Sequence, residues 1–267
     1  MAKIFSEDRH QYFDKIKPFK TAIESYLKKE QTVLALLNKD DPGAAVKKLA
    51  LADGMISLTS YYIILSGVSQ AMLKLKNEEA LNEGRKSLYK AVIYLEEVVS
   101  RHLDAPFSDY EEKLAAIGSV GPRRRYLLVR RLGLAIQLLE NAYGDNTKWR
   151  WSFVELEGRY TAAAKNLIDL KNAVANTDPR SPDYEPTMRH LRMVKKLLMQ
   201  AADRYREKYE LSTNRVDDFK MGINFLAALR RIHLLMGEKD GVETVKKKLD
   251  IWSEKLETDS KKHYERS

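Results

Sequence analysis

Apolar residues along most of this chain recur every three or four positions, which is the spacing of one face of an α-helix. The first such stripe is formed by Tyr12, Ile16, Phe19, Ile23, Tyr26, Val33 and Leu37. Glu30 is its one polar member. No long run shows the alternation of β-branched and polar residues that is typical of strands. With 12 glycines and 7 prolines in 267 residues, helices have few interruptions. The sequence therefore predicts an all-α fold.

Turn residues divide the chain into eight or nine predicted helices. Pro18 lies within the first stripe, so the helix either kinks there or ends at Lys17. Asn77 is a good N-cap for a later helix. Pro122 predicts the start of a helix that runs to about Tyr143. Because the connecting turns are short, we expect antiparallel helical hairpins laid side by side.

Proline is concentrated between Asn176 and Pro186, where three of eleven residues are proline. This segment is the best candidate for a linker or a long ordered loop. We therefore expect a helical N-terminal region over residues 1–176 and a proline-rich loop or linker over 177–186. A C-terminal helical region over 187–267 is expected to pack on the first as one continuous array.

Two stretches of the chain share a pattern of apolar helix, short polar turn and amphipathic helix. They are 61–99 and 223–256, and their turns are Lys76-Asn77-Glu78-Glu79 and Gly237-Glu238-Lys239-Asp240. This pattern resembles the helix–turn–helix unit of tetratricopeptide-type solenoids, over about 75 residues. The resemblance implies a stacked superhelix with a concave surface that binds a peptide or a subunit. An irregular helical bundle is the alternative architecture.

Motifs for catalysis and metal binding are missing from the sequence. The chain has no cysteine, and its five histidines are scattered without a pair at four-residue spacing. Gly118-Ser119-Val120-Gly121-Pro122 is a glycine-rich turn, but it lacks the Lys and Ser/Thr of a Walker motif. We therefore expect no catalytic residue, no metal site and no cofactor, and we interpret the protein as non-enzymatic.

Residues 54–73 form an uncharged segment about as long as a bilayer-spanning helix. Several serines and a threonine dilute its apolar content, so we expect a helix buried within a soluble fold and no integral membrane span. The N-terminus is charged almost at once and lacks the apolar core of a secretory signal. The expected location is cytoplasmic.

Between Glu112 and Glu140 the chain contains no acidic residue, although its net charge of +9 depends on six basic residues there. Most of them lie on the helix predicted to begin at Pro122. At about 100° per residue, one face of this helix is apolar. It is formed by Leu128, Leu132, Ala135, Ile136 and Leu139. The opposite face has Leu127, Leu134 and Leu138 along its middle, with arginines on both flanks: Arg123, Arg124, Arg130 and Arg131.

Two interpretations of this mixed face remain open. The helix can be internal, with its arginines paired to acids of neighbouring helices. Alternatively, it can bind an acidic amphipathic segment of another protein, where leucines give affinity and arginines set orientation. Trp149 and Trp151 point about 200° apart on the following helix. We expect Trp151 to pack inward and Trp149 to be the exposed aromatic residue.

The leading hypothesis is a helical scaffold or adaptor that binds a protein partner or assembles into a larger complex. An oligomer of this chain is also possible under this hypothesis. Its predicted partner surface comprises Arg123, Arg124, Leu127, Arg130, Arg131, Leu134 and Trp149. The partner would present an acidic and apolar surface. The second hypothesis is a protein that binds nucleic acid or another anionic surface, since the sequence pI is about 9.4.

Overall fold

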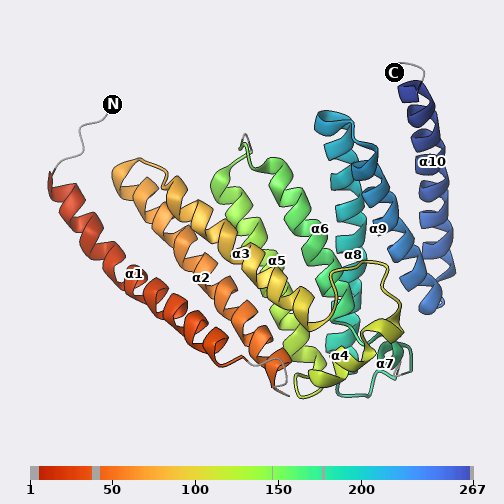
Figure 1. The fold of residues 1–267 in the computed structure, drawn as a ribbon, viewed down its shortest axis with the longest axis horizontal. Coiled ribbons are helices and arrows are strands. Elements are labelled where there is room, and N and C mark those ends of the chain that lie inside the picture. Colours follow the sequence, from red (N-terminus) through yellow and green to blue (C-terminus); the bar gives the residue numbers. More distant parts are fainter. Residues whose placement is uncertain (1–5, 38–42, 146, 176–177, 265–267) are drawn as a thin grey trace. The chain divides into compact units, whose positions relative to one another are not determined.

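The computed structural model describes residues 6–37, 43–145, 147–175 and 178–264 of the chain. The described residues are all-helical, as the sequence predicts (Figure 1). Their α-helices are α1 (Ser6–Ala35), α2 (Ala44–Leu73), α3 (Glu78–Val98), α4 (Glu111–Ala116), α5 (Pro122–Tyr143), α6 (Arg150–Asn166), α7 (Leu170–Ala175), α8 (Tyr184–Lys208), α9 (Val216–Leu235) and α10 (Lys239–Tyr264). A 3₁₀ turn, η1 (Phe107–Asp109), precedes α4, and a π-helical turn, η2 (Tyr209–Thr213), follows α8.

The chain forms two compact units that do not follow the predicted division at residues 177–186. Unit 1 comprises residues 1–99, 115–120 and 127–153, and unit 2 comprises 100–114, 121–126 and 154–267. The first residues of α5 therefore belong to unit 2 and its remainder to unit 1. The predicted linker is also shorter than expected, because Tyr184, Glu185 and Pro186 form the first turn of α8, where proline is tolerated.

In unit 1, α2 lies between α1 and α3 (Figure 1). It is the one helix of the described residues that is long and apolar enough to cross a membrane, and 56% of its most apolar window is buried inside the structure. A core helix passes the same test. Thr59 shows how closely α2 and α3 approach, because its hydroxyl donates hydrogen bonds to Met55 O (2.9 Å) in its own helix and to Gly84 O (3.3 Å) in α3.

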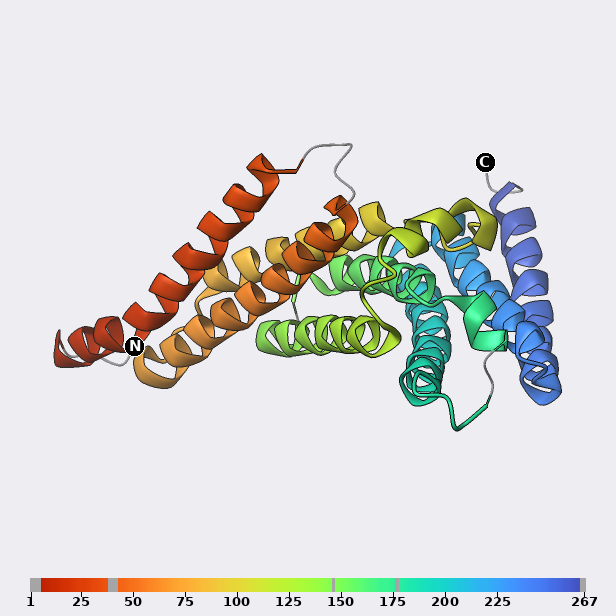
Figure 2. The ribbon, with the colours of Figure 1, turned by 90° about the horizontal axis from the view of Figure 1, so that it is seen from below.

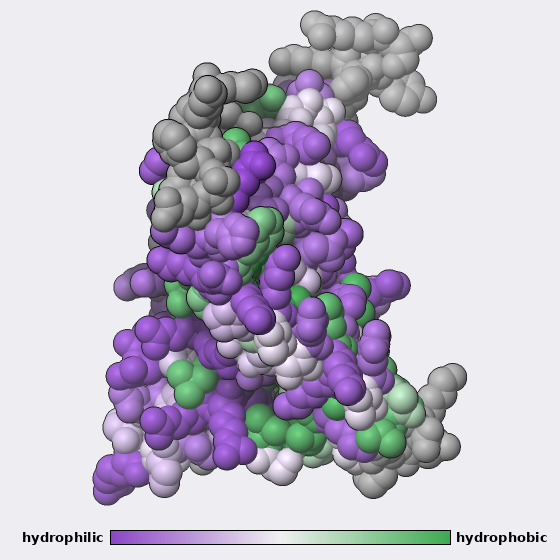
Figure 3. Space-filling model, turned by 90° about the vertical axis from the view of Figure 1, so that its left-hand side faces the viewer, coloured by the Kyte–Doolittle hydropathy of each residue, from purple (hydrophilic) through white to green (hydrophobic). Residues whose placement is uncertain are grey.

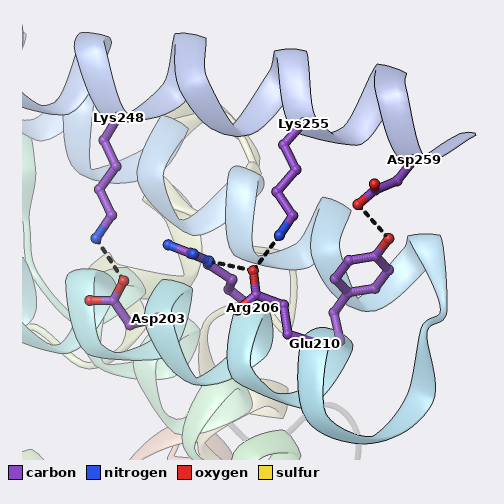
Figure 4. Close-up of polar contacts among 7 residues, drawn as sticks. Asp203, Arg206, Glu210, Lys248, Lys255 and Asp259 are labelled. Atoms are coloured by element: carbon purple, nitrogen blue, oxygen red, sulfur yellow. Dashed lines mark hydrogen bonds and ion pairs between the residues drawn. The ribbon is translucent and has the colours of Figure 1, made fainter.

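In unit 2, α9 packs against both α8 and α10. The core between them includes two stacked pairs of aromatic rings, Tyr205 with Phe225 and Tyr209 with Phe219. Polar contacts also join α8 and the π-helical turn to α10 (Figure 4). Lys248 Nζ lies 2.6 Å from Asp203 Oδ1, and Lys255 Nζ lies 2.6 Å from Glu210 Oε1. Bases on this side of unit 2 are thus neutralised by the unit's own acids.

Some element boundaries differ from the sequence-based expectations. α1 continues through Pro18, which excludes the alternative that the first helix ends at Lys17. The segment that follows α5 forms two helices, α6 and α7, which are separated at residues 167–169. The physical reason lies in α6, where Asn166 Nδ2 donates to the carbonyl oxygens of Ser100 (2.9 Å) and His102 (3.1 Å). These bonds tie the end of α6 to the segment that precedes η1.

Large apolar side chains are also exposed outside α5, for example Phe13 and Leu36 near the two ends of α1. Figure 3 views the molecule from the side on which α1 lies and shows mostly hydrophilic residues, with hydrophobic residues in small separate groups. Separate exposed apolar residues are normal on a protein surface. Helix α5 differs from this pattern, because several of its exposed apolar side chains lie in one row.

Candidate docking surface on helix α5

The buried face of α5 is the one predicted from the sequence. Leu128, Leu132, Ala135, Ile136 and Leu139 are all buried. A Cβ atom built on Gly84 of α3 would lie 3.3 Å from Leu139 Cδ1, so α3 and α5 approach closely in unit 1. Tyr143 near the end of α5 adds a hydrogen bond from its hydroxyl to Asn82 Oδ1 of α3 (2.8 Å). These contacts fix which side of α5 points away from the unit.

The outward side of α5 carries three aligned leucines. Leu127, Leu134 and Leu138 keep 40%, 54% and 46% of their surface exposed. In Figure 2, α2 and α3 lie to one side of α5, and no other described helix of unit 1 lies on its opposite side. We call this surface the leucine–arginine face. It comprises Leu127, Arg130, Arg131, Leu134 and Leu138, all within unit 1.

The two arginines of the leucine–arginine face differ in their surroundings. Arg131 forms an ion pair with Asp53 of α2, and its Nη2 donates a hydrogen bond to Ser57 Oγ (3.0 Å). Arg130 is exposed, and its side chain makes no hydrogen bond or ion pair with the described residues. One flank of the leucines is therefore internally neutralised and the other carries a free positive charge.

A model of the TP0443 family matches residues 8–260. The chain belongs to the TP0443 family. Neither a curated protein nor a solved structure matches the chain. The name of the TP0443 family states no activity.

The three successive arginines at the start of α5 differ in their solvent exposure in this TP0443-family chain. Arg123 and Arg124 are exposed, and neither side chain has a hydrogen bond or ion pair within the described residues. Arg125 is buried in unit 2. Burial lowers the pKa of its guanidinium, and the nearby Asp169 carboxylate partly offsets this effect. The basic run is thus exposed at two positions and internal at the third.

Trp149 differs from its expected placement. It is half-buried, and the Arg85 guanidinium carbon lies 3.9 Å from the centre of its ring. Arg85 also donates a hydrogen bond from Nη1 to Ser152 Oγ (3.3 Å). Trp151, expected to pack inward, is half-buried as well, with the Arg150 guanidinium over its ring. Trp149 therefore belongs to a cation–π contact within unit 1, and it immediately precedes the first residue of α6.

Sequence reasoning missed a small cavity in unit 2. Its volume is about 30 Å³, and Arg125, Asp169 and His190 are among its lining residues. His190 Nε2 donates a hydrogen bond to Ala164 O (3.0 Å), since a carbonyl can only accept. The cavity has room for about one water molecule. Its residues come from three distant segments, so no sequence spacing could reveal it.

No group of three or more His, Cys, Asp or Glu side chains that could hold a metal ion occurs among the described residues. The surface that stands out chemically in this TP0443-family chain is the leucine–arginine face, because apolar side chains and an uncompensated cation share one helix there.

Proposed function

We propose that this chain is a non-enzymatic helical scaffold that binds another protein through the leucine–arginine face. The observation that carries the proposal is the row of exposed leucines beside Arg130, which has no acidic partner among the described residues. An acidic amphipathic segment fits this surface, because it supplies apolar contacts for the leucines and carboxylates for the free guanidinium.

Free energies of leucine burial indicate how much of the binding free energy the three leucines can supply. Full burial of one leucine contributes about 1.5–3 kcal/mol, and each of these leucines still exposes about half of its surface. Their combined contribution is roughly 3 kcal/mol, which is less than the 4.1 kcal/mol of a millimolar complex. The partner must therefore also cover the arginine stems and form charge-assisted hydrogen bonds.

The alternative function, binding of nucleic acid or another anionic surface, uses the arginines but leaves the leucines unexplained. Asp53 also places a carboxylate next to Arg131, which opposes an approaching phosphate. A protein partner accounts for both kinds of side chain. For that reason we rank phosphate binding second and treat it as an outcome of the experiments.

The rest of the proposal follows the sequence-based hypotheses. The two stretches that resemble tetratricopeptide units, 61–99 and 223–256, overlap the helix pairs α2–α3 and α9–α10 only in part, and the resemblance supports a scaffold role. At 30 and 21 residues, α2 and α3 are together longer than one 34-residue repeat, so we favour an irregular array of hairpins. A cytoplasmic location, the absence of a cofactor and a possible oligomeric assembly remain part of the proposal.

Site-specific photo-crosslinking tests the proposal. A photoreactive residue replaces Leu134 in the full chain, and the cross-linked partner segment is identified by mass spectrometry. The matched control carries the same residue at Leu75, which is 57% exposed in the same unit but lies outside α5. We expect position 134 to capture an acidic segment with apolar residues at helical spacing. Equal capture at both positions would count against the proposal.

A further inference from the structure

The leucine–arginine face carries its charge unevenly. At about 100° per residue, Arg130 lies about 60° to one side of Leu127 and Arg131 about 40° to the other. The guanidinium of Arg131 is paired with Asp53 and also bonded to Ser57. Arg130 has neither kind of partner among the described residues. The flank of Arg130 is therefore positive, and the flank of Arg131 is close to neutral.

Other residues of α5 do not remove this difference. Arg123 and Arg124 are exposed, but they belong to unit 2 and are not part of the leucine–arginine face. Gln137, two turns after Arg130 on the same flank, is exposed and uncharged. Asp53 makes the neutral flank unfavourable for an incoming carboxylate, because like charges repel. Acidic side chains of a partner are thus expected next to Arg130.

The face is suited to a helical partner. Its leucines span residues 127–138 of a straight helix, which is about 16 Å at 1.5 Å per residue. The backbone N–H and C=O groups in the middle of α5 are bonded within the helix, so an extended peptide could not add to it as a strand. A second amphipathic helix can pack its apolar stripe along the leucine row.

A second copy of this chain fits the same face poorly. In a symmetric antiparallel pairing of two α5 helices the two Arg130 flanks would meet. In a parallel pairing the Arg130 flank would meet the flank of Arg131, where the Asp53 carboxylate is already paired. The acid-free stretch between Glu112 and Glu140 offers no carboxylate for such a pairing. Charge complementarity therefore favours a different, acidic helix.

We infer that the partner is an amphipathic helix with acidic residues along one flank of its apolar stripe, and that pairing with Arg130 sets the direction in which it binds. This inference rests on the proposed function. Turning a helix end to end on the leucine row exchanges its two flanks. A helix with acids on one flank can place them next to Arg130 in only one of the two directions.

Two synthetic peptides test the direction. Both are helical, share one composition and carry the same leucine stripe, but their glutamates lie on opposite flanks. The chain contains no cysteine, so Asn141→Cys at the end of α5 accepts a single nitroxide label. NMR line broadening then shows which peptide end lies near residue 141. We expect the two peptides to bind in opposite directions.

Two variants distinguish the contributions of the two flanks to peptide binding. Arg130→Gln should weaken both peptides about tenfold, the expected loss of one charged hydrogen bond, and should abolish the preferred direction. Arg131→Gln should preserve the direction, because Asp53 remains on that flank. The inference is overturned if both peptides bind in the same direction, if neither shows a direction, or if neither binds. Selective capture at Leu134 in the cross-linking experiment would still support the proposed function in each of these cases.

Discussion

Glu30 is the one polar residue in the apolar stripe of α1, and its contacts explain why an acid is tolerated there. Its buried carboxylate accepts hydrogen bonds from Lys90 Nζ (2.9 Å) and from the Tyr94 hydroxyl (2.7 Å), both in α3. Burial raises the pKa of Tyr94, and the bond to Glu30 raises it further. The sequence shows the unusual acid, but partners some 60 positions away cannot be read from helical spacing.

The pairing of Glu30 with Lys90 predicts a specific pattern of stabilities. Lys90→Met leaves the buried carboxylate with the Tyr94 hydroxyl as its remaining donor from α3, and should lower the free energy of unfolding by about 2 kcal/mol. Adding Glu30→Gln removes the charge and should recover most of this loss. Urea unfolding of the two single variants and the double variant measures the coupling. Additive losses would show that the pair is not coupled.

His190 makes stability depend on pH. The pKa of His190 is lowered from the ordinary 6.5 to about 4. Burial is the main cause and Arg125 adds to it, while the hydrogen bond to the Ala164 carbonyl acts in the opposite direction. The unfolded chain therefore binds a proton on this imidazole at a pH where the folded chain does not. The stabilisation is present above pH 6.5 and is lost as the pH falls towards 4, by an amount on the order of 3 kcal/mol.

His190→Gln tests this pH dependence, because glutamine keeps a donor near Ala164 but does not titrate. The difference in unfolding free energy between the wild type and the variant, measured by urea titration at several pH values, should shrink as the pH falls from 6.5 to 4.5. A constant difference over this range would contradict a buried neutral imidazole.

At the residue level, the sequence predicted the two faces of α5 but not the contacts that its residues and Trp149 make with distant segments. Periodicity separates buried Leu132 from exposed Leu134 because it depends on one helix alone. The burial of Arg125 and the stacking of Arg85 on Trp149 depend on segments distant in sequence. The same periodicity placed Leu138 along the middle of the arginine-flanked face, and its exposure adds it to the candidate surface.

Among the elements, the close approach of α6 and α8 in unit 2 depends on a glycine. A Cβ atom on Gly158 would lie 2.7 Å from Tyr205 Cε2. Tyr205 is buried and stacked on Phe225, so its ring cannot move aside freely. Gly158→Ala should therefore destabilise the protein by about 1–3 kcal/mol through overpacking.

Gly67 provides a matched control in another helix. A Cβ atom there would meet nothing within 4 Å. Gly67→Ala should consequently stabilise α2 by about 0.5–1 kcal/mol, since alanine loses less backbone entropy than glycine. Thermal unfolding of both variants should give shifts of opposite sign. A stabilising effect of Gly158→Ala would show that α6 and α8 can separate at low cost.

Helix positions were largely predictable from local signals, and helix interruptions were not. Asn77 caps α3 as expected, with its Oδ1 accepting from Ala80 N (3.0 Å). The break after Asn166 was missed because it is stabilised by bonds to Ser100 and His102, about 65 positions earlier. At Pro18 the sequence left two alternatives open, and the structure excludes the one in which the helix ends at Lys17.

For the whole molecule, the distribution of charge matters more than its sum of +9. In unit 2, lysines of α10 pair with acids of α8 and of the π-helical turn. In unit 1, Lys90 pairs with Glu30 and Arg131 with Asp53. Arg130 departs from this pattern, and it stands beside the exposed leucines. The net charge alone suggested phosphate binding, whereas the local arrangement favours an acidic protein segment.

The most direct test of the docking proposal compares two ligands on three forms of the full chain. A fluorescent acidic amphipathic helical peptide and a single-stranded RNA of equal charge are titrated against the wild type, Leu134→Asp and Leu75→Asp. We predict that the peptide binds the wild type and Leu75→Asp alike, binds Leu134→Asp at least tenfold more weakly, and is not displaced by RNA. Tight RNA binding that is unaffected by Leu134→Asp and falls steeply with salt would contradict the proposed docking surface.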